Sequence, residues 1–205
     1  MGSEYELKFR ATPAQLEQLL TDFPGDWQEI PMKTTYFDTA DRRISQKKQT
    51  LRQRMEGGHG VCTLKTPASG GIRGEWEVPG EALGAALPLL SRQSGLCLPR
   101  PSELIPVCGA TFTRLALRLS FGDWEAELAL DRGMLQNGPH ALPFAEVELE
   151  LKAGAPGQLD RFGREFQVRY HLETEPRSKY LRARLLRSEE RRVGKECRSR
   201  WSPYH

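Results

Sequence analysis

The most constraining feature of this chain is a two-residue alternation of ionic and apolar side chains that recurs along its length. In the segment EYELKFR, residues 4–10, Glu, Lys and Arg occupy every even position, and Tyr, Leu and Phe occupy every odd position. Because successive side chains of a β-strand point to opposite faces, this segment is predicted to be a strand with one ionic and one apolar face. The same pattern recurs at 51–54, 63–65, 72–78, 114–119, 124–131 and 146–152.

A single strand of this kind fits a sheet with one face in water. Applied to every strand, that interpretation is strained, because Glu146, Glu148 and Glu150 would lie about 7 Å apart along one face. Like charges at this spacing repel each other unless cations lie among them. We therefore expect an α+β fold built on a closed antiparallel eight-stranded β-barrel, a tunnel with a charged lumen and with helices packed outside on the apolar faces.

Helical segments punctuate the predicted strands. Thr12, Pro13 and Gln15 form a capping-box pattern that predicts a short helix from residue 13. Residues 80–91 are weakly helical in pattern, and Leu159, Phe162 and Phe166 predict a later amphipathic helix.

Composition divides the chain at about residue 186. Residues 187–205 hold six basic and three acidic residues, which account for the whole formal net charge of +3. We expect residues 1–186 to form one domain and 187–205 to be a basic, disordered tail that is not native to it. The domain is then neutral, so neither nucleic acid nor a membrane is an expected partner. No apolar run is long enough to cross a bilayer and no signal-peptide pattern opens the chain, so a cytoplasmic location is expected.

The ionic faces indicate the chemistry of a ligand. Arginine and lysine side chains in number suit a ligand with several negative charges, and arginine forks match phosphate oxygens. Carboxylates in number suit hard divalent cations such as Mg²⁺ or Mn²⁺. The four cysteines and four histidines show no zinc or disulfide spacing. Together these features predict a polyphosphate bridged to a metal ion.

The ordered set of motifs resembles the CYTH family, the triphosphate tunnel metalloenzymes, and most closely its bacterial inorganic triphosphatases. The family also includes thiamine triphosphatases and class IV adenylyl cyclases. The resemblance covers residues 1 to about 186. It rests on ExExK at 4–8, YFDT at 36–39, LRxR at 51–54, TLK at 63–65, RxExE at 73–77, Arg114, ExxxD at 127–131, ExExE at 146–150 and Ser178-Lys179.

The resemblance implies roles for individual residues. The triphosphate would be bound by Lys8, Arg52, Arg54, Lys65, Arg73, Arg114 and Lys179. Metal would be held by Glu4, Glu6, Asp131, Glu146, Glu148 and Glu150, and the catalytic groups would be Glu4, Glu6, Lys8 and Glu148. Two ions are implied, one bridging phosphate oxygens and one positioning the attacking water. Glu75, Glu77, Glu125 and Glu127 would either orient the arginines or form plain ion pairs.

The expected function is therefore metal-dependent hydrolysis of a small triphosphate, with inorganic tripolyphosphate giving pyrophosphate and orthophosphate. Two alternatives stay open at this point. One is chemistry on a nucleotide or on thiamine triphosphate, including adenylyl cyclisation. The other is a non-catalytic polyphosphate-binding module, which the three closely spaced glutamates of 146–150 disfavour.

Overall fold

The computed structural model describes residues 5–69 and 72–186, with the side chains of 68–73 also left out, and the predicted tail at 187–205 lies outside the described residues. The elements in chain order are β1 (Glu6–Arg10), α1 (Pro13–Asp22), β2 (Gln28–Thr39), α2 (Arg43–Gln46), β3 (Thr50–Glu56), β4 (His59–Ser69), β5 (Ile72–Pro79), α3 (Leu83–Ser94), η1 (Pro101–Glu103), β6 (Leu104–Ser120), β7 (Glu125–Asn137), β8 (His140–Ala153), α4 (Pro156–Arg169) and β9 (Glu173–Thr174). A further helical segment covers 179–186.

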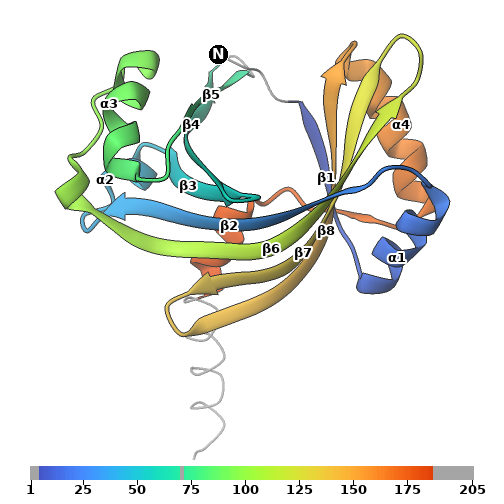
Figure 1. Cartoon of the computed structure of the whole chain (residues 1–205), viewed down its shortest axis with the longest axis horizontal. Helices are drawn as coiled ribbons and strands as arrows, with labels where there is room; N and C mark the ends of the chain where they lie inside the picture. The colour runs from blue at the N-terminus through green and yellow to red at the C-terminus, as the bar shows by residue number, and fades with distance from the viewer. Residues whose placement is uncertain (1–4, 70–71, 187–205) are drawn as a thin grey trace, which may run out of the picture.

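The predicted strands form one antiparallel sheet, so the α+β class is confirmed. Its strand order is β5-β4-β3-β2-β6-β7-β8-β1-β9. Figure 1 shows this sheet curled into a trough with β5 at one rim and β1 at the other. Within the described residues no backbone ladder joins β5 to β1 or β9, so the expected closed barrel of eight strands is not confirmed. The short β9 pairs with Phe9 and Arg10 of β1, and this pairing occupies an edge that closure would need.

The apolar faces of the strands point outward and pack against helices, as the alternation predicts. On one side, Leu128 and Leu149 of the sheet share a buried cluster with Leu19 of α1 and with Leu159 and Phe166 of α4. On the other side, inward-facing residues of α3 pack on the outer face of β3, β4 and β5, in a cluster made of Leu51, Leu64, Val78, Leu87 and Leu90 among others. The two helical layers therefore cover the convex face near the two rims (Figure 1).

The concave face is divided rather than ionic throughout. Beside its charged part lies a third buried cluster that includes Phe112, Leu135 and Phe144. The helical segment 179–186 packs on this apolar part through Ala183 and Leu186. The strands are longer than their ionic stretches, and their alternation continues with apolar residues such as Phe144, two positions before Glu146. The lumen is therefore partly filled by the end of the described chain.

The predicted helix starts are confirmed where the capping signal was specific. The Thr12 hydroxyl accepts from the Gln15 N–H at 3.3 Å, and the Gln15 side chain accepts from the Thr12 N–H at 2.8 Å. The helix α3 covers Leu83–Ser94, close to the weak helical pattern of 80–91. None of the helices in the described part of the chain is long and apolar enough to span a bilayer.

Candidate functional site

Two cavities on the concave face share Arg52, Arg54 and Arg114. The first, of about 340 Å³, is bordered by β1, β2, β3, β4, β6, β8 and residues 176–181. The second, of about 570 Å³, continues past the same three arginines toward β5 and β7. The shared lining shows that the two cavities adjoin at these arginines. A larger hollow of about 980 Å³ beside the end of α1 brings together fewer charged groups and adjoins the second cavity at Glu127 and Lys152.

The two cavities differ in charge. We call the first cavity the basic mouth, because among the described residues its charged lining is Lys8, Lys48, Arg52, Arg54, Lys65, Arg114 and Lys179 against Glu6 and Glu148. The charged lining of the second cavity, the acidic mouth, is Arg52, Arg54, Arg114 and Lys152 against Glu56, Glu75, Glu77, Glu127 and Glu150. A polyanion is therefore attracted to the basic mouth more strongly than to the acidic mouth.

Arg52 and Arg54 project from β3 on the same face of the strand and bring two positive charges side by side. Arg52 is 12% exposed, and its nearest carboxylate oxygen, on Glu75, is 3.8 Å away. Its buried Nε has no hydrogen-bond acceptor within the described chain. Burial lowers the pKa of Arg52, and the neighbouring charge of Arg54 lowers it further. An anion with several oxygens would supply the missing acceptor and relieve the repulsion.

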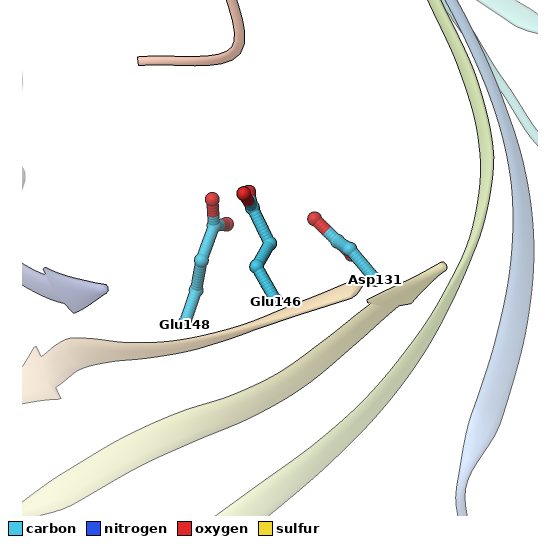
Figure 2. Close-up of side chains that lie close together, drawn as sticks. All are labelled: Asp131, Glu146 and Glu148. Atoms are coloured by element: carbon cyan, nitrogen blue, oxygen red, sulfur yellow. The ribbon is translucent and has the colours of Figure 1, made fainter. Parts of the chain in front are cut away.

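Three carboxylates gather next to Arg114. Asp131 lies directly across from Glu146 in the β7–β8 ladder, and Glu148 is two positions further along β8. Figure 2 shows the three side chains rising side by side from the two strands. Each offers an oxygen within 4.8 Å of the others. Asp131 and Glu146 are fully buried.

Three cations neutralise this carboxylate group. The Lys179 ammonium lies 2.7 Å from Asp131 and 2.9 Å from Glu148, and it also contacts Glu146. Arg114 donates two hydrogen bonds of 2.8 Å to Asp131 and another to Glu148. Arg182 donates to Glu146. A lysine ammonium has three N–H donors, and here three carboxylates surround it.

The charge balance sets the protonation of the group. Burial would raise the pKa of Glu148, but Lys179 and Arg114 outweigh it and hold that pKa well below its usual range. Burial would lower the pKa of Lys179, but the three carboxylates raise it instead. For Glu146, burial dominates and raises the pKa. Glu148 is therefore an ionised carboxylate at neutral pH, at the boundary between the buried group and the basic mouth.

Most of the predicted site residues come together. Glu6, Lys8, Arg52, Arg54, Lys65, Arg114, Glu148 and Lys179 line the basic mouth, and Glu150 lines the acidic one. Asp131 and Glu146 lie beneath Lys179. Glu4 and the side chain of Arg73 lie outside the described residues. Three of the four glutamates expected to orient arginines or form ion pairs have a basic partner here. Glu75 pairs with Lys65 at 3.0 Å, Glu125 with Arg118 at 3.2 Å, and Glu127 with Lys152 at 3.7 Å.

Sequence reasoning missed two basic residues of this region. Lys48 lines the basic mouth, and Arg182 neutralises Glu146. A signal existed for each. Lys48 precedes Arg52 and Arg54 by an even number of positions, as expected for residues on one face of a strand. Arg182 follows Lys179 by three positions, which places Arg182 and Lys179 on one face of a helix.

Comparisons with known proteins agree with this geometry. The CYTH domain family profile matches residues 2–183. The inorganic triphosphatase of Haemophilus influenzae is 29% identical over 202 residues, which cover 93% of this chain and 56% of that protein. The chain thus spans about half the length of this curated relative.

Solved structures share the fold. A candidate adenylyl cyclase from Hippeastrum, described as having a dominant triphosphatase activity, superposes with a TM-score of 0.66 at 19% identity, covering 92% of this chain and 96% of the other. A candidate adenylate cyclase from Bacillus halodurans gives a TM-score of 0.59 at 18% identity, over 86% and 94% of the two chains. A Pyrococcus horikoshii protein gives 0.57 at 19% identity, over 87% and 96%.

Proposed function

The chain belongs to the CYTH domain family, and from this premise we propose that it hydrolyses inorganic tripolyphosphate to pyrophosphate and orthophosphate. The observation that carries the proposal is the basic mouth, in which, among the residues that the structure describes, seven basic residues face two acidic ones and a buried arginine Nε has no acceptor. Bound phosphate oxygens would satisfy these donors inside a site largely removed from water, where charge-assisted hydrogen bonds are strong. The activity of the Haemophilus influenzae relative supports the same reaction.

Substrate binding falls to the basic side chains that line the mouth. Arg52, Arg54 and Arg114 lie where the two cavities meet, and we assign them to the phosphate oxygens. Lys8 on β1 and Lys65 on β4 line the same cavity from opposite sides of the trough. A phosphate bound between Lys8 and Lys65, with Arg73 contributing from β5, would join the two sides of the trough. The tunnel would then be closed by side chains and ligand, although no backbone pairing closes it among the described residues.

A divalent cation, Mg²⁺ or Mn²⁺, fits the carboxylates beside these bases. Glu6 lies directly opposite Glu150 in the β1–β8 ladder, so the two side chains are neighbours on one face, and Lys152 lies 2.7 Å from Glu150. Glu148 is the next carboxylate on the same face. We propose that Glu6, Glu148 and Glu150, with Glu4, hold the metal through oxygen atoms, which such ions prefer. The bound ion would neutralise phosphoryl charge and lower the pKa of a coordinated water.

Asp131 and Glu146 belong to the same predicted ligand set but meet Arg114, Lys179 and Arg182 here. We propose that they support the site from behind by holding these cations in place. Lys179 then acts on Glu148, keeping its carboxylate ionised and fixing its orientation, and Lys8 beside Glu148 faces the substrate.

The assay that tests the function supplies tripolyphosphate, ATP or thiamine triphosphate with Mg²⁺ or Mn²⁺ and separates the products by ion chromatography. Orthophosphate and pyrophosphate in equal amounts from tripolyphosphate are the expected result. Cyclic nucleotide from ATP would assign the site to cyclase chemistry, and binding without products would make the domain a polyphosphate-binding module.

Glu148→Gln tests the site itself. The amide keeps the shape of the side chain but removes the charge that the metal and Lys179 require, so we expect kcat to fall by about 100-fold or more. Glu173→Gln is the matched control, because that side chain is 78% exposed on β9 and lies outside both mouths. Circular dichroism would establish that both variants fold. Full turnover by folded Glu148→Gln contradicts the assignment.

A further inference from the structure

Lys48 occupies a backbone position that favours glycine. It lies between α2 and β3 with φ of 55°, in the left-handed region. Its N–H donates to the Ser45 carbonyl at 2.9 Å, and the next N–H, of Gln49, donates to the Ile44 carbonyl at 3.1 Å. This pair of bonds is the Schellman pattern that ends a helix, with Lys48 at the position where a residue without Cβ is least strained. The local backbone therefore gives no reason for a lysine here.

The Lys48 side chain has a clear environment instead. Lys48, Thr50, Arg52 and Arg54 follow one another at every second position, and all four line the basic mouth. Lys48 thus continues the row of cavity-lining residues of β3 beyond the strand itself. It is exposed, whereas Arg52 and Arg54 are 12% and 13% exposed, so it lies at the solvent end of the row. Its neighbour Lys47 is not part of the lining.

We propose that Lys48 is a substrate-positioning residue that holds the outer phosphate of a tripolyphosphate whose inner phosphates are bound by the arginines. This inference rests on the proposed function and deepens it. A ligand with only two phosphates, bound by the deeper arginines, would not extend to the solvent end of the row and would not meet the Lys48 ammonium. Lys48 therefore contributes to the preference for a triphosphate over pyrophosphate, and the strained backbone is the cost of placing a charge there.

The test compares four single variants with the unaltered chain. Lys48→Gly removes the charge and the backbone strain together. Lys48→Asn removes the charge but keeps a residue that tolerates the left-handed region. Lys48→Arg keeps the charge. Lys47→Asn makes the same charge change one residue away, outside the cavity lining. Affinities for tripolyphosphate and pyrophosphate are measured by calorimetry in metal-free buffer at low salt, and melting temperatures are measured for every variant.

We expect Lys48→Gly and Lys48→Asn to melt at or above the temperature of the unaltered chain while their Kd for tripolyphosphate rises roughly two- to fivefold. Their Kd for pyrophosphate should not change, and Lys48→Arg and Lys47→Asn should match the unaltered chain. The difference should shrink as salt rises, because the Lys48 charge is exposed. A purely structural role would change the melting temperature without changing the ratio of the two affinities.

Two results overturn the inference: an unchanged tripolyphosphate Kd in both uncharged Lys48 variants, or an equal loss in Lys47→Asn. The outcome is separate from that of the proposed function. If the unaltered chain binds tripolyphosphate but releases no phosphate with Mg²⁺ or Mn²⁺, hydrolysis is refuted, and the ratio of affinities still decides the role of Lys48. Failure of the unaltered chain to bind tripolyphosphate overturns both.

Discussion

Individual residues in this protein take their roles from the charges that surround them. Glu148 and Glu146 are the same residue type two positions apart on β8, yet the pKa of Glu148 is lowered and that of Glu146 is raised. Glu146 is fully buried and Glu148 is 13% exposed, and both meet Lys179. For Glu146 burial outweighs the attraction of Lys179, and the charges of Glu148 and Asp131 raise the pKa further. Glu148 meets both Lys179 and Arg114, and its carboxylate also feels Lys8. The carboxylate that stays ionised is the one that lines the basic mouth.

Glu175 is another buried carboxylate and determines part of the acid stability of the fold. Burial would raise its pKa, but hydrogen bonds from Arg177 and Arg10 outweigh burial and lower the pKa to about 2. The folded state thus favours the ionised form. The ionised Glu175 carboxylate therefore stabilises the folded state by roughly 3 kcal/mol. This stabilisation is complete above the ordinary pKa of 4.5 and is lost as pH falls from there toward 2.

Glu175→Gln should therefore lower the free energy of unfolding by about 3 kcal/mol at pH 7, because Arg10, Arg177 and Arg182 lose their shared anion. The difference in free energy of unfolding between Glu175→Gln and the unaltered chain should narrow below pH 4.5 and disappear near pH 2. Urea unfolding at a series of pH values measures it, with exposed Glu173→Gln as the control. A gap of constant size across this range would show that the carboxylate charge is not its source.

At the scale of elements, side chains at helix ends join segments far apart in the chain. Gln15 completes the capping box of α1, and its amide also donates to the carbonyls of Tyr170 and His171 at the end of α4, at 2.9 and 3.0 Å. The start of one helix and the end of another thus share one side chain. The segment 179–186 acts similarly, since Lys179, Arg182, Ala183 and Leu186 lie on one helical face that meets both the carboxylates and the apolar cluster.

Gln15→Ala should lower the free energy of unfolding by roughly 1–3 kcal/mol, because it removes the side-chain half of the capping box and leaves the Tyr170 and His171 carbonyls without that donor. Gln18→Ala is the matched control: Gln18 lies on the same helix, is exposed, and within the described residues makes no side-chain hydrogen bond. Its effect should stay within about 0.5 kcal/mol. Chemical denaturation measures both, and equal effects would refute the role of Gln15 at the helix ends.

At the scale of the whole molecule, the trough depends on the segment that fills it. Without residues 178–186, the apolar cluster around Phe112 and Phe144 loses Ala183 and Leu186. The carboxylates Asp131, Glu146 and Glu148 lose Lys179 at the same time. Uncompensated buried charges are among the most destabilising changes in proteins.

A chain that ends after Leu186 should keep the melting temperature and the tripolyphosphate kinetics of the full chain, whereas one that ends after Arg177 should lose its cooperative melting transition. Circular dichroism melts and phosphate-release assays on the two shortened chains test this. Loss of folding or activity on removal of 187–205 would show that the predicted domain boundary at 186 is wrong.

The sequence by itself determined the properties that repeat locally. The two-residue alternation identifies the strands and the face each presents, because side-chain direction in a strand depends only on position parity. It also brings Lys8, Arg52, Arg54, Arg114 and Glu148 to one face, and the capping box places the start of α1. These features need no knowledge of distant segments.

Only the tertiary structure decided how the faces are used. The curvature of the sheet and the gap between β5 and β1 depend on how all the strands pack together. Lys179 follows Glu148 by 31 residues and Asp131 by 48, so its position among their carboxylates depends on the folding of 179–186 into the trough. The left-handed backbone of Lys48 is likewise a property of the turn between α2 and β3. Electrostatic roles follow from distances in space, and alternation along a strand does not contain those distances.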